Sequence, residues 1–566
     1  MSNSVSIVKV NWSSYPGFLT AQIALGLLSA LALDCCFPLG GPMPRWHGSV
    51  AWIALVPLML AILRKSAILR RRYICQAAII GYVAGVTWCG LNSYWIYRTM
   101  RYYGGMSSYY AAGLLLLYSL VLGGYWGVFT LALAVLRKRL GVLPALCLAP
   151  FIWPAVELLA YHLTCVPWDQ LGYAQVDNFW LTRVAPITGT YGIATVIMLG
   201  NALFVAALLK VPYFLRSISL KFGDSVCWLI TALIFSVAWQ IGSWMPPPPA
   251  PTSSSALLLQ VNLGTQDTPD NDAMTWDAEM SRFIAASGQY CRPYLGGIPK
   301  LTTTEIVPNC SSVRGSHPNL IVWPESPAPF VDEDPAFRED ISILAKKTGA
   351  AAIIGDTAIQ FTLHSGHPVE KTYNSASVFS SRGIYIGRYD KIHLVPFGEY
   401  TPFRKYLSWA SALTDRIGKF NHGTRYLVFP INHHLYGIFI CYESIFSNEV
   451  RIFAKNGAQV FVNISDDAWY GDTSAPWQHL NMARMRAIEN DRWLLIDTNN
   501  GITAAVDPDG RVTQAVPRNQ FTALVARYGF EHDHTFYTRY GDIYAFFCCA
   551  IALSGLFLAS FGIRGS

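Results

Sequence analysis

Three side chains in this sequence have the types needed for nucleophilic acyl chemistry, and each stands at the end of a β-rich run. Cys441 ends the apolar run 437–440, Glu325 follows a short hydrophobic run, and Lys391 follows Tyr389-Asp390. A thiol needs a base or a positive environment to react at neutral pH. A carboxylate can take the thiol proton, and an ammonium can stabilise the oxyanion of a tetrahedral intermediate. Together the three indicate a site that cleaves an amide or an ester.

Other side chains offer alternatives for the same chemistry. Glu399 could orient the lysine. His393 and His479 are candidate bases, since a Cys-His pair is the usual arrangement for a catalytic thiol. Spacing in the sequence does not choose between a carboxylate and an imidazole. Taken alone, a cysteine after a strand is more often a buried packing residue than a nucleophile.

The composition describes a membrane protein with a substantial polar part. The 566 residues are too many for one soluble domain, so two or more folding units are expected. They are 52% hydrophobic and only 14% charged, against roughly 25% charged in soluble domains. The mean hydropathy is +0.30. The net charge of +7 needs no nucleic acid as a partner, because basic residues gather at the ends of apolar segments.

Eight apolar stretches are expected to cross a membrane, although the second is short for the about 20 residues that a crossing needs. Their approximate ranges are 17–37, 50–63, 75–97, 108–136, 142–164, 189–210, 226–246 and 541–562.

The distribution of Lys and Arg predicts the orientation of these spans. The connections after the second, fourth and sixth spans and the tail after the eighth are basic. The alternate short connections are poorer in basic residues, with Arg98 and Arg101 in one and Arg183 in another. The positive-inside rule then places both termini in the cytoplasm and the long connection outside, which is the periplasm of a Gram-negative cell. We therefore expect three parts: a membrane domain over 1–246 with seven helices, a catalytic domain over 247–540, and an eighth helix with its cytoplasmic tail over 541–566.

The pattern of the chain changes after the proline run at 246–251, which cannot continue a helix and forms a stiff spacer. Beyond it, strands alternate with helices, which favours an α/β domain. The expected strands are 257–261, 320–323, 351–354, 375–379, 437–440 and 460–464, and the expected helices are 277–287, 334–348 and 479–491.

Several motifs together resemble a known family. Trp323-Pro324-Glu325, Tyr389-Asp390-Lys391 and Cys441-Tyr442-Glu443 resemble, in that order, the Glu-Lys-Cys triad of the nitrilase, or carbon-nitrogen hydrolase, superfamily. The eight spans and the segments 396–402, 467–471, 478–492, 499–502 and 507–510 are similar to the apolipoprotein N-acyltransferase family. The resemblance covers nearly the whole chain, and the combination is specific where each motif alone is weak.

The resemblance implies a fold and a role for each site residue. The fold would be a polytopic α-helical membrane domain with eight spans plus a periplasmic nitrilase-like α-β-β-α sandwich. Glu325 would be the general base, Lys391 the stabiliser of oxyanion and thiolate, and Cys441 the nucleophile. Glu399 and Glu443 would be supporting carboxylates, and Tyr442 would line the pocket.

Two positions depart from the family pattern, and one segment looks like an insertion. Asp466 stands where the family more usually has Asn, and Tyr470 replaces a common Phe, which concerns local hydrogen bonding and leaves the triad intact. The insertion, 289–318, carries Cys291 and Cys310. An oxidising periplasm permits a disulfide between them, and we state it as a hypothesis.

The reaction that the resemblance implies is a ping-pong acyl transfer. Cys441 would attack the sn-1 ester of a phospholipid, typically phosphatidylethanolamine, and form a thioester. The amine of the N-terminal diacylglyceryl-cysteine of an apolipoprotein would then accept the acyl chain. No cofactor or metal is expected, since none of the twelve cysteines shows the spacing of a zinc site, and the protein is expected to act as a monomer in the bacterial inner membrane.

Candidate substrate contacts and two rival functions complete the predictions. Trp323, Arg98, Arg101 and Trp168 are proposed substrate-binding residues, although exterior arginines and tryptophans are commonly membrane-edge anchors. A membrane-tethered nitrilase-type amidohydrolase acting on a small amide would share the triad, but it does not explain the eight spans. A transporter with a periplasmic sensor domain would explain the spans but not the triad.

Overall fold

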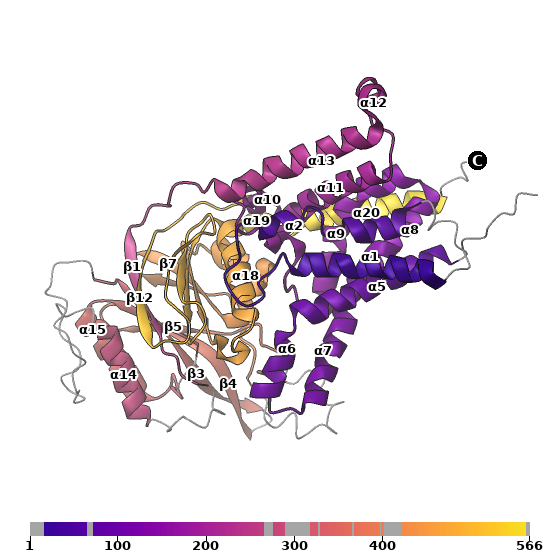
Figure 1. Ribbon diagram of the computed structural model, residues 1–566. Coiled ribbons are helices and arrows are strands. Elements are labelled where there is room, and N and C mark those ends of the chain that lie inside the picture. The colour runs from indigo at the N-terminus through magenta and orange to yellow at the C-terminus, as the bar shows by residue number, and fades with distance from the viewer. Residues whose placement is uncertain are drawn as a thin grey trace, which may run out of the picture.

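The structure is a computed structural model that describes residues 16–64, 72–264, 275–288, 317–325, 329–364, 367–396, 398–400 and 420–561. It has a helical part and a part built around two β-sheets, and these two parts lie end to end (Figure 1). Cys291 and Cys310 lie outside the described residues, so their disulfide stays a prediction.

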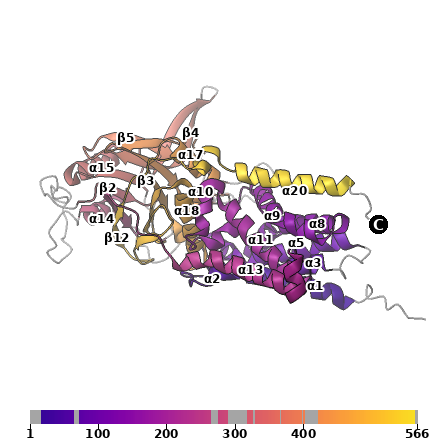
Figure 2. The ribbon, with the colours of Figure 1, turned by 90° about the horizontal axis from the view of Figure 1, so that it is seen from above.

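Most of the longer helices of the helical part run roughly along one direction, with α20 beside α9 and α8, whereas α7 runs steeply across it (Figures 1 and 2). Their bounds are α1 Pro16–Asp34, α3 Val56–Leu63, α5 Tyr73–Asn92, α7 Ser108–Leu122, α8 Gly124–Arg139, α9 Val142–Thr164, α11 Thr190–Leu208, α13 Asp224–Gln240 and α20 Ile543–Phe561. Shorter helical segments join them: α2 His47–Val50, α6 Trp95–Arg98, η2 Thr99–Tyr103, η3 Leu171–Gln175, η4 Leu181–Val184, α10 Ala185–Thr188, α12 Arg216–Phe222 and η5 Ile241–Trp244.

Six helical segments among the described residues are long and apolar enough to cross a membrane: Tyr73–Asn92, Ser108–Arg139, Val142–Thr164, Thr190–Leu208, Asp224–Trp244 and Ile543–Phe561. They coincide with six of the eight predicted stretches, so the chain is a multi-pass membrane protein. The two others are shorter: Leu19–Asp34 is apolar, and α3 has eight residues, of which seven are buried. The total of eight spans stays a prediction, because an apolar run this short fits a buried helix as well as a crossing.

The predicted span over 108–136 consists of two helices, α7 and α8, which meet at Gly123. A Cβ at Gly123 would lie 2.5 Å from the backbone nitrogen of Val86 on α5. Only glycine at position 123 therefore lets α5 pack closely against the junction between α7 and α8.

The remaining part is a sandwich of two six-stranded sheets with helices outside, as the nitrilase resemblance implies. One sheet has the order β12-β1-β2-β3-β4-β5 and the other β11-β10-β9-β8-β7-β6. The strands are β1 Ser254–Gln260, β2 Leu320–Trp323, β3 Ala351–His364, β4 His367–Phe379, β5 Tyr385–Asp390, β6 Val428–Ile431, β7 His434–Ile440, β8 Val460–Ser465, β9 Trp493–Thr498, β10 Ala504–Val506, β11 Val512–Ala515 and β12 Thr522–Tyr528. The helices are α14 Trp276–Gly288, α15 Pro335–Thr348, η9 Cys441–Ile445, α17 Ser447–Lys455, η10 Asp467–Tyr470, α18 Ala475–Asn490 and α19 Phe536–Tyr540.

The parallel strands explain why the chemistry-bearing residues can meet. β2 runs parallel to β1 and β3, and β7 runs parallel to β8, which runs parallel to β9. The carboxyl ends of parallel strands lie at one edge of a sheet, and the polar residues that follow β2, β7 and β8 are gathered there. The fully buried strands read as continuous apolar runs, which is why Leu320–Trp323 and Val460–Ser465 are recognisable in the sequence.

Helix α18 lies between the sheets and the helical part (Figure 1). It joins the two parts through polar contacts. Nη2 of Arg484 lies 2.6 Å from Oδ1 of Asp177 in the loop after η3, and Nη2 of the buried Arg486 donates to the Tyr173 hydroxyl at 3.0 Å. The sandwich is therefore fixed against the helices by directional bonds as well as by apolar packing.

Candidate active site

Glu325 and Lys391, predicted as base and oxyanion stabiliser, are hydrogen-bonded to each other. Nζ of Lys391 donates to Oε1 of Glu325 at 2.9 Å and to Oε1 of Glu399 at 3.0 Å. The lysine side chain is 1% exposed. Burial alone would lower the pKa of Lys391, but the two carboxylates outweigh it and hold the pKa well above its ordinary value. The lysine is therefore a permanent cation at the centre of the site.

Asn374, on β4, is a member of this cluster for which the sequence analysis had no signal. Its amide nitrogen donates to Oε1 of Glu325 at 2.6 Å and to Oε1 of Glu399 at 2.7 Å. The same two oxygens receive the ammonium of Lys391, so each carboxylate is held by an amide and by a cation. Oε2 of Glu325 accepts from the backbone nitrogen of Asp466 at 2.8 Å. Residues from three other segments thus fix the position of Glu325.

Cys441 is the first residue after β7, and its backbone is left-handed, with φ of 52°. A non-glycine residue in this region is strained and persists only where its surroundings enforce it. Burial raises the pKa of the Cys441 thiol well above its ordinary value, and the charge of Glu325 raises it further, while Lys391 and a hydrogen bond from Ser465 oppose both. The resting group is therefore a thiol, which must lose its proton to a neighbour before it can attack.

Glu443 connects the segments that carry Cys441 and Lys391. Oε2 accepts from the backbone nitrogen of Ile440 at 2.7 Å, and Oε1 accepts from the Tyr389 hydroxyl at 2.8 Å and from the backbone nitrogen of Ile392 at 2.7 Å. Burial raises the pKa of Glu443 to about 7, against the opposing effect of its backbone donors. The Glu443 carboxyl group therefore links the backbone at Ile440 to Tyr389 and Ile392, and its role as a supporting carboxylate stays a prediction.

The two histidines that the sequence left open as bases are engaged elsewhere. His393 pairs with Glu449 at 3.0 Å and stacks on Phe446 with ring centroids 3.6 Å apart. Nε2 of His479 lies 3.1 Å from the carbonyl oxygen of Cys441, not from its sulfur, and 2.7 Å from the Ser444 hydroxyl. The geometry favours Glu325 as the proton acceptor.

Trp323 is not brought to this cluster. It is fully buried in the apolar core between the first sheet and its helices, where it packs on Phe283 and donates from its indole nitrogen to the Ser287 hydroxyl at 2.9 Å. Trp323 is therefore a core packing residue, and we do not keep it as a candidate substrate contact. Tyr442, directly after Cys441, is buried next to Phe446, with ring centroids 5.2 Å apart.

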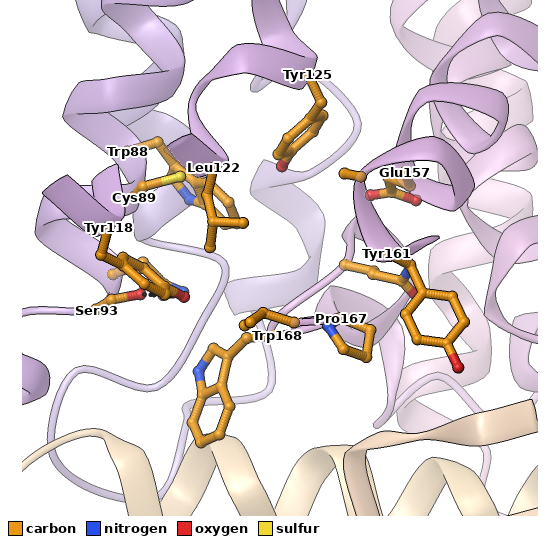
Figure 3. Close-up of a pocket in the computed structure, with 14 residues that line it drawn as sticks. Trp88, Cys89, Ser93, Tyr118, Leu122, Tyr125, Glu157, Tyr161, Pro167 and Trp168 are labelled. Carbon is orange, nitrogen blue, oxygen red and sulfur yellow. Dashed lines mark hydrogen bonds between the residues drawn. The ribbon is translucent and has the colours of Figure 1, made fainter. Parts of the chain in front are cut away.

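A pocket of about 430 Å³, a volume that includes its open side, lies in the helical part next to the sandwich. Figure 3 shows its aromatic walls, with Trp168 directed toward the pale orange ribbon of the sandwich. The indole nitrogen of Trp168 donates to Gln478 on α18 at 2.9 Å, and the ring lies 6.3 Å from that of Tyr470. The lining residues are Trp88, Cys89, Asn92, Ser93, Tyr118, Leu122, Tyr125, Glu157, Ala160, Tyr161, Val166, Pro167, Trp168 and Gln170.

Arg98 and Arg101 lie outside this pocket lining, on the exposed segment formed by α6 and η2. The guanidinium of Arg98 lies over the Tyr102 ring, 5.3 Å from its centroid, and Nη1 of Arg101 donates to the carbonyl of Met106 at 3.3 Å. Both remain candidate contacts for a lipid head group. Within the described residues, no group of three or more His, Cys, Asp or Glu side chains could hold a metal ion.

Comparison with known proteins matches both parts of the chain. The family model described as the apolipoprotein N-acyltransferase N-terminal domain matches residues 29–203, and the carbon-nitrogen hydrolase model matches residues 310–528. A solved amidase from Nesterenkonia sp. aligns with 53% of this chain and 98% of its own, at 16% identity and a TM-score of 0.35.

Relatives with the name apolipoprotein N-acyltransferase align over nearly the full length. The protein from Geobacter metallireducens is 31% identical over 93% of this chain and 93% of its own, and that from Bordetella bronchiseptica is 30% identical over 93% of each. Both alignments therefore include the helical part as well as the sandwich. The chain belongs to the apolipoprotein N-acyltransferase family.

Proposed function

We propose that this protein transfers a fatty acyl chain from the sn-1 position of a membrane phospholipid to the N-terminal amine of a diacylated apolipoprotein. The observation that carries the proposal is the cluster of Glu325, Lys391 and Cys441, in a chain whose apolar helical part holds an aromatic pocket that is bonded to α18 through Trp168. Full-length similarity to named acyltransferases favours this activity over hydrolysis of a small amide. The acceptor and the donor, typically phosphatidylethanolamine, are part of the proposal.

In the first half-reaction, the Cys441 thiol gives its proton to Glu325, and the thiolate attacks the sn-1 carbonyl carbon. The Lys391 ammonium stabilises the oxyanion as the tetrahedral intermediate forms. The intermediate collapses with cleavage of the ester C–O bond, and the leaving alkoxide takes the proton from Glu325. Lysophospholipid departs, and the acyl chain remains on Cys441 as a thioester.

In the second half-reaction, the neutral α-amine of the apolipoprotein's N-terminal cysteine attacks the thioester carbonyl. Glu325 accepts the proton that the nitrogen loses, the C–S bond breaks, and the sulfur regains a proton from Glu325. The products are the N-acylated lipoprotein and the free thiol. Buried surroundings protect the thioester from water between the two steps, because Cys441 is only 6% exposed.

Most of the pocket's walls are aromatic and aliphatic side chains of the helical part, which is the chemistry that an acyl chain would contact, and the polar residues Asn92, Ser93, Glu157 and Gln170 complete them. Trp168 bonds to the same helix α18 that contacts the backbone of Cys441. A chain lying among these residues would place an ester near the sandwich. We therefore propose that the donor enters from the membrane side and that Trp168 lies against its acyl chain.

The activity is tested by incubating the purified protein with phosphatidylethanolamine labelled in its sn-1 chain and measuring the mass of the Cys441 peptide. A fatty-acyl mass on that peptide, discharged to a diacylated lipopeptide added afterwards, is the expected result. Cys441→Ala should abolish it, while Cys147→Ala, which removes an exposed thiol on α9, should not. Free fatty acid without lipopeptide acylation would contradict the transferase and favour a hydrolase.

We also propose a topology of eight spans in the inner membrane, with both termini in the cytoplasm and the sandwich in the periplasm. It is supported by the basic residues at alternate connections and by the six helices of spanning length. In a background without other exposed cysteines, Phe361→Cys on the β3–β4 hairpin should react with a membrane-impermeant maleimide in intact spheroplasts. Lys138→Cys, at the end of α8, should react only after permeabilisation. The reverse pattern would overturn the orientation.

A further inference from the structure

A ring of polar groups begins and ends at Cys441. Ser465 follows Ile464, which pairs with Ile440 in the parallel ladder of β7 and β8, so Ser465 lies beside Cys441. The Ser465 hydroxyl donates to Oδ1 of Asp467 at 2.7 Å, and Ser465 acts to lower the pKa of the Cys441 thiol. The same oxygen of Asp467 lies 3.2 Å from Nδ1 of His479. Nε2 of His479 lies 3.1 Å from the carbonyl oxygen of Cys441. Three side chains thus connect the strand position beside Cys441 with the backbone carbonyl of Cys441.

The members of the ring come from three different elements and are buried. Ser465 ends β8, Asp467 begins η10, and His479 lies in the first turns of α18; their exposed fractions are 0%, 2% and 3%. The fold also leaves space for the carboxylate, because a Cβ at Gly501 would collide with Oδ2 of Asp467. Buried polar groups are costly unless they are paired, so a ring of this kind demands an explanation.

The protons of the ring are constrained by simple counting. The Ser465 hydroxyl has one proton and two neighbours that can accept it, the Asp467 carboxylate and a Cys441 thiolate. If both ring nitrogens of His479 carry protons, Nδ1 satisfies Asp467, and Nε2 donates to the carbonyl of Cys441. The hydroxyl of Ser465 is then free to turn toward the sulfur.

The surroundings of His479 favour the doubly protonated ring. Burial would lower its pKa, but the charge of Asp467 on η10 and its hydrogen bond outweigh burial and raise the pKa above its ordinary value. The Cys441 carbonyl on η9 and the more distant Glu325 act in the same direction. The other near groups are the Ser444 hydroxyl, 2.7 Å away, and the Tyr470 ring, with centroids 6.3 Å apart.

We propose that Ser465, Asp467 and His479 are positioning residues that hold Cys441 in its left-handed conformation and supply a hydroxyl donor to its thiolate. His479 fixes the carbonyl that follows the strained φ, and Asp467 fixes His479. Ser465 stabilises the sulfur once Glu325 has removed its proton. The inference rests on the proposed role of Cys441 as nucleophile and adds three residues that support it without contact to the acyl chain.

The test is the pH dependence of Cys441 alkylation by iodoacetamide, followed on the Cys441 peptide by mass spectrometry in the full-length protein in detergent. This measurement reports the thiolate and needs no phospholipid. Ser465→Ala should move the midpoint to higher pH and lower the rate at pH 7 by about tenfold, because the thiolate loses a hydrogen-bond donor. Ser465→Thr keeps the hydroxyl and should restore most of the rate.

A matched control removes a buried hydroxyl elsewhere. Ser377 on β4 donates to the Asp332 carboxylate at 2.9 Å, as Ser465 does to Asp467, and both serines are fully buried. Ser377→Ala should therefore leave the alkylation midpoint at the wild-type value. Any shift it shared with Ser465→Ala would reveal a general effect of a lost serine–carboxylate bond and would overturn the proposal.

Asp467→Asn is a second variant, which removes a charge and keeps the side-chain volume. It tests the proposal if Ser465→Ala reduces the fraction of folded protein. The charge of Asp467 raises the pKa of the Cys441 thiol, so its removal should lower the alkylation midpoint. The loss of the partner of His479 should lower kcat for acyl-Cys441 formation, with KM for phospholipid unchanged. Midpoints equal to the wild-type value in both variants would refute the positioning role. Failure of the proposed function is distinguishable, because the wild type would then be alkylated normally and yet acquire no acyl chain.

Discussion

Lys391 and Glu325 are joined by a hydrogen bond of 2.9 Å in a site where the lysine also binds Glu399 at 3.0 Å. One cation therefore neutralises two carboxylates only in part, and the three groups carry a net charge of −1 before the thiol reacts. Transfer of the thiol proton to Glu325 leaves the total charge of the site unchanged. The step consequently needs no proton from solution, which suits a buried site.

Replacement of Lys391 should strongly reduce the rate of acyl transfer to Cys441. Lys391→Met leaves Glu325 and Glu399 as like charges around one amide, and it removes the partner of the oxyanion, so the rate of acyl-Cys441 formation should fall by about 10³-fold. The rate is measured by mass spectrometry after mixing with phospholipid. Lys346→Met, at an exposed position on α15, is the control and should retain activity. A loss below about tenfold would exclude an electrostatic role of this size.

Substitutions of Asn374 should lower kcat to different extents, depending on the charge of the new side chain. Asn374→Leu deprives Glu325 and Glu399 of their shared donor and should lower kcat by about 10- to 100-fold. Asn374→Asp should be worse, because it adds a third negative charge at the same place. Steady-state transfer to a diacylated lipopeptide gives both values. The opposite order of the two variants would show that volume matters here more than charge.

Asp466 should make the stability depend on pH. Burial raises its pKa from 3.8 to about 7, so the folded protein keeps a proton that the unfolded chain loses. The resulting stabilisation is complete below pH 3.8 and is lost as the pH rises through about 7. Asp466→Asn lacks this titration and should be more stable than the wild type at pH 8, by at most about 4 kcal/mol, with a smaller difference at pH 5. Denaturant unfolding in detergent at both pH values measures the two differences; equal values at pH 5 and pH 8 would contradict the prediction.

The bond between Arg484 and Asp177 should contribute to the docking of the sandwich. Arg484 and His47 outweigh burial and hold the pKa of Asp177 below its ordinary value, so this contribution is present above pH 3.8 and is lost on acidification below it. Because the Asp177 side chain is 35% exposed, solvent screening limits the coupling to about 1 kcal/mol. A double-mutant cycle of Arg484→Met and Asp177→Asn, read by thermal unfolding at pH 7, measures it. Additive effects would show no coupling.

The sequence indicated those parts of the site that follow apolar runs. Cys441 and Glu325 each come just after a strand whose last residues are all buried, and such runs are visible without a structure. The strand β3 was expected over 351–354 but extends to His364, and it pairs with β4 along this whole length. The extension alternates apolar and polar residues over 359–364, which is typical of a strand, and the prediction made no use of this pattern.

Residues that support others across the fold had no local signal. Asn374 is one polar residue within a strand of thirteen, and its importance arises from two carboxylates 49 and 25 positions away. The two histidines could not be ranked from spacing, because the direction of a ring depends on tertiary packing. The family resemblance predicted the triad, whereas the ring through Ser465 is seen only in the structure.

The polar contacts across α18 have a consequence for experiments on the isolated sandwich. Residues 247–540 expressed alone would leave Arg484 and Arg486 without Asp177 and Tyr173, and Gln478 without Trp168. Unpaired polar groups on α18 and an exposed apolar surface where the helical part had packed favour aggregation or a rearrangement of α18. His479 follows Gln478 on α18, so a soluble fragment would carry altered surroundings at Cys441. Kinetics should therefore be measured on the intact chain in a lipid or detergent environment.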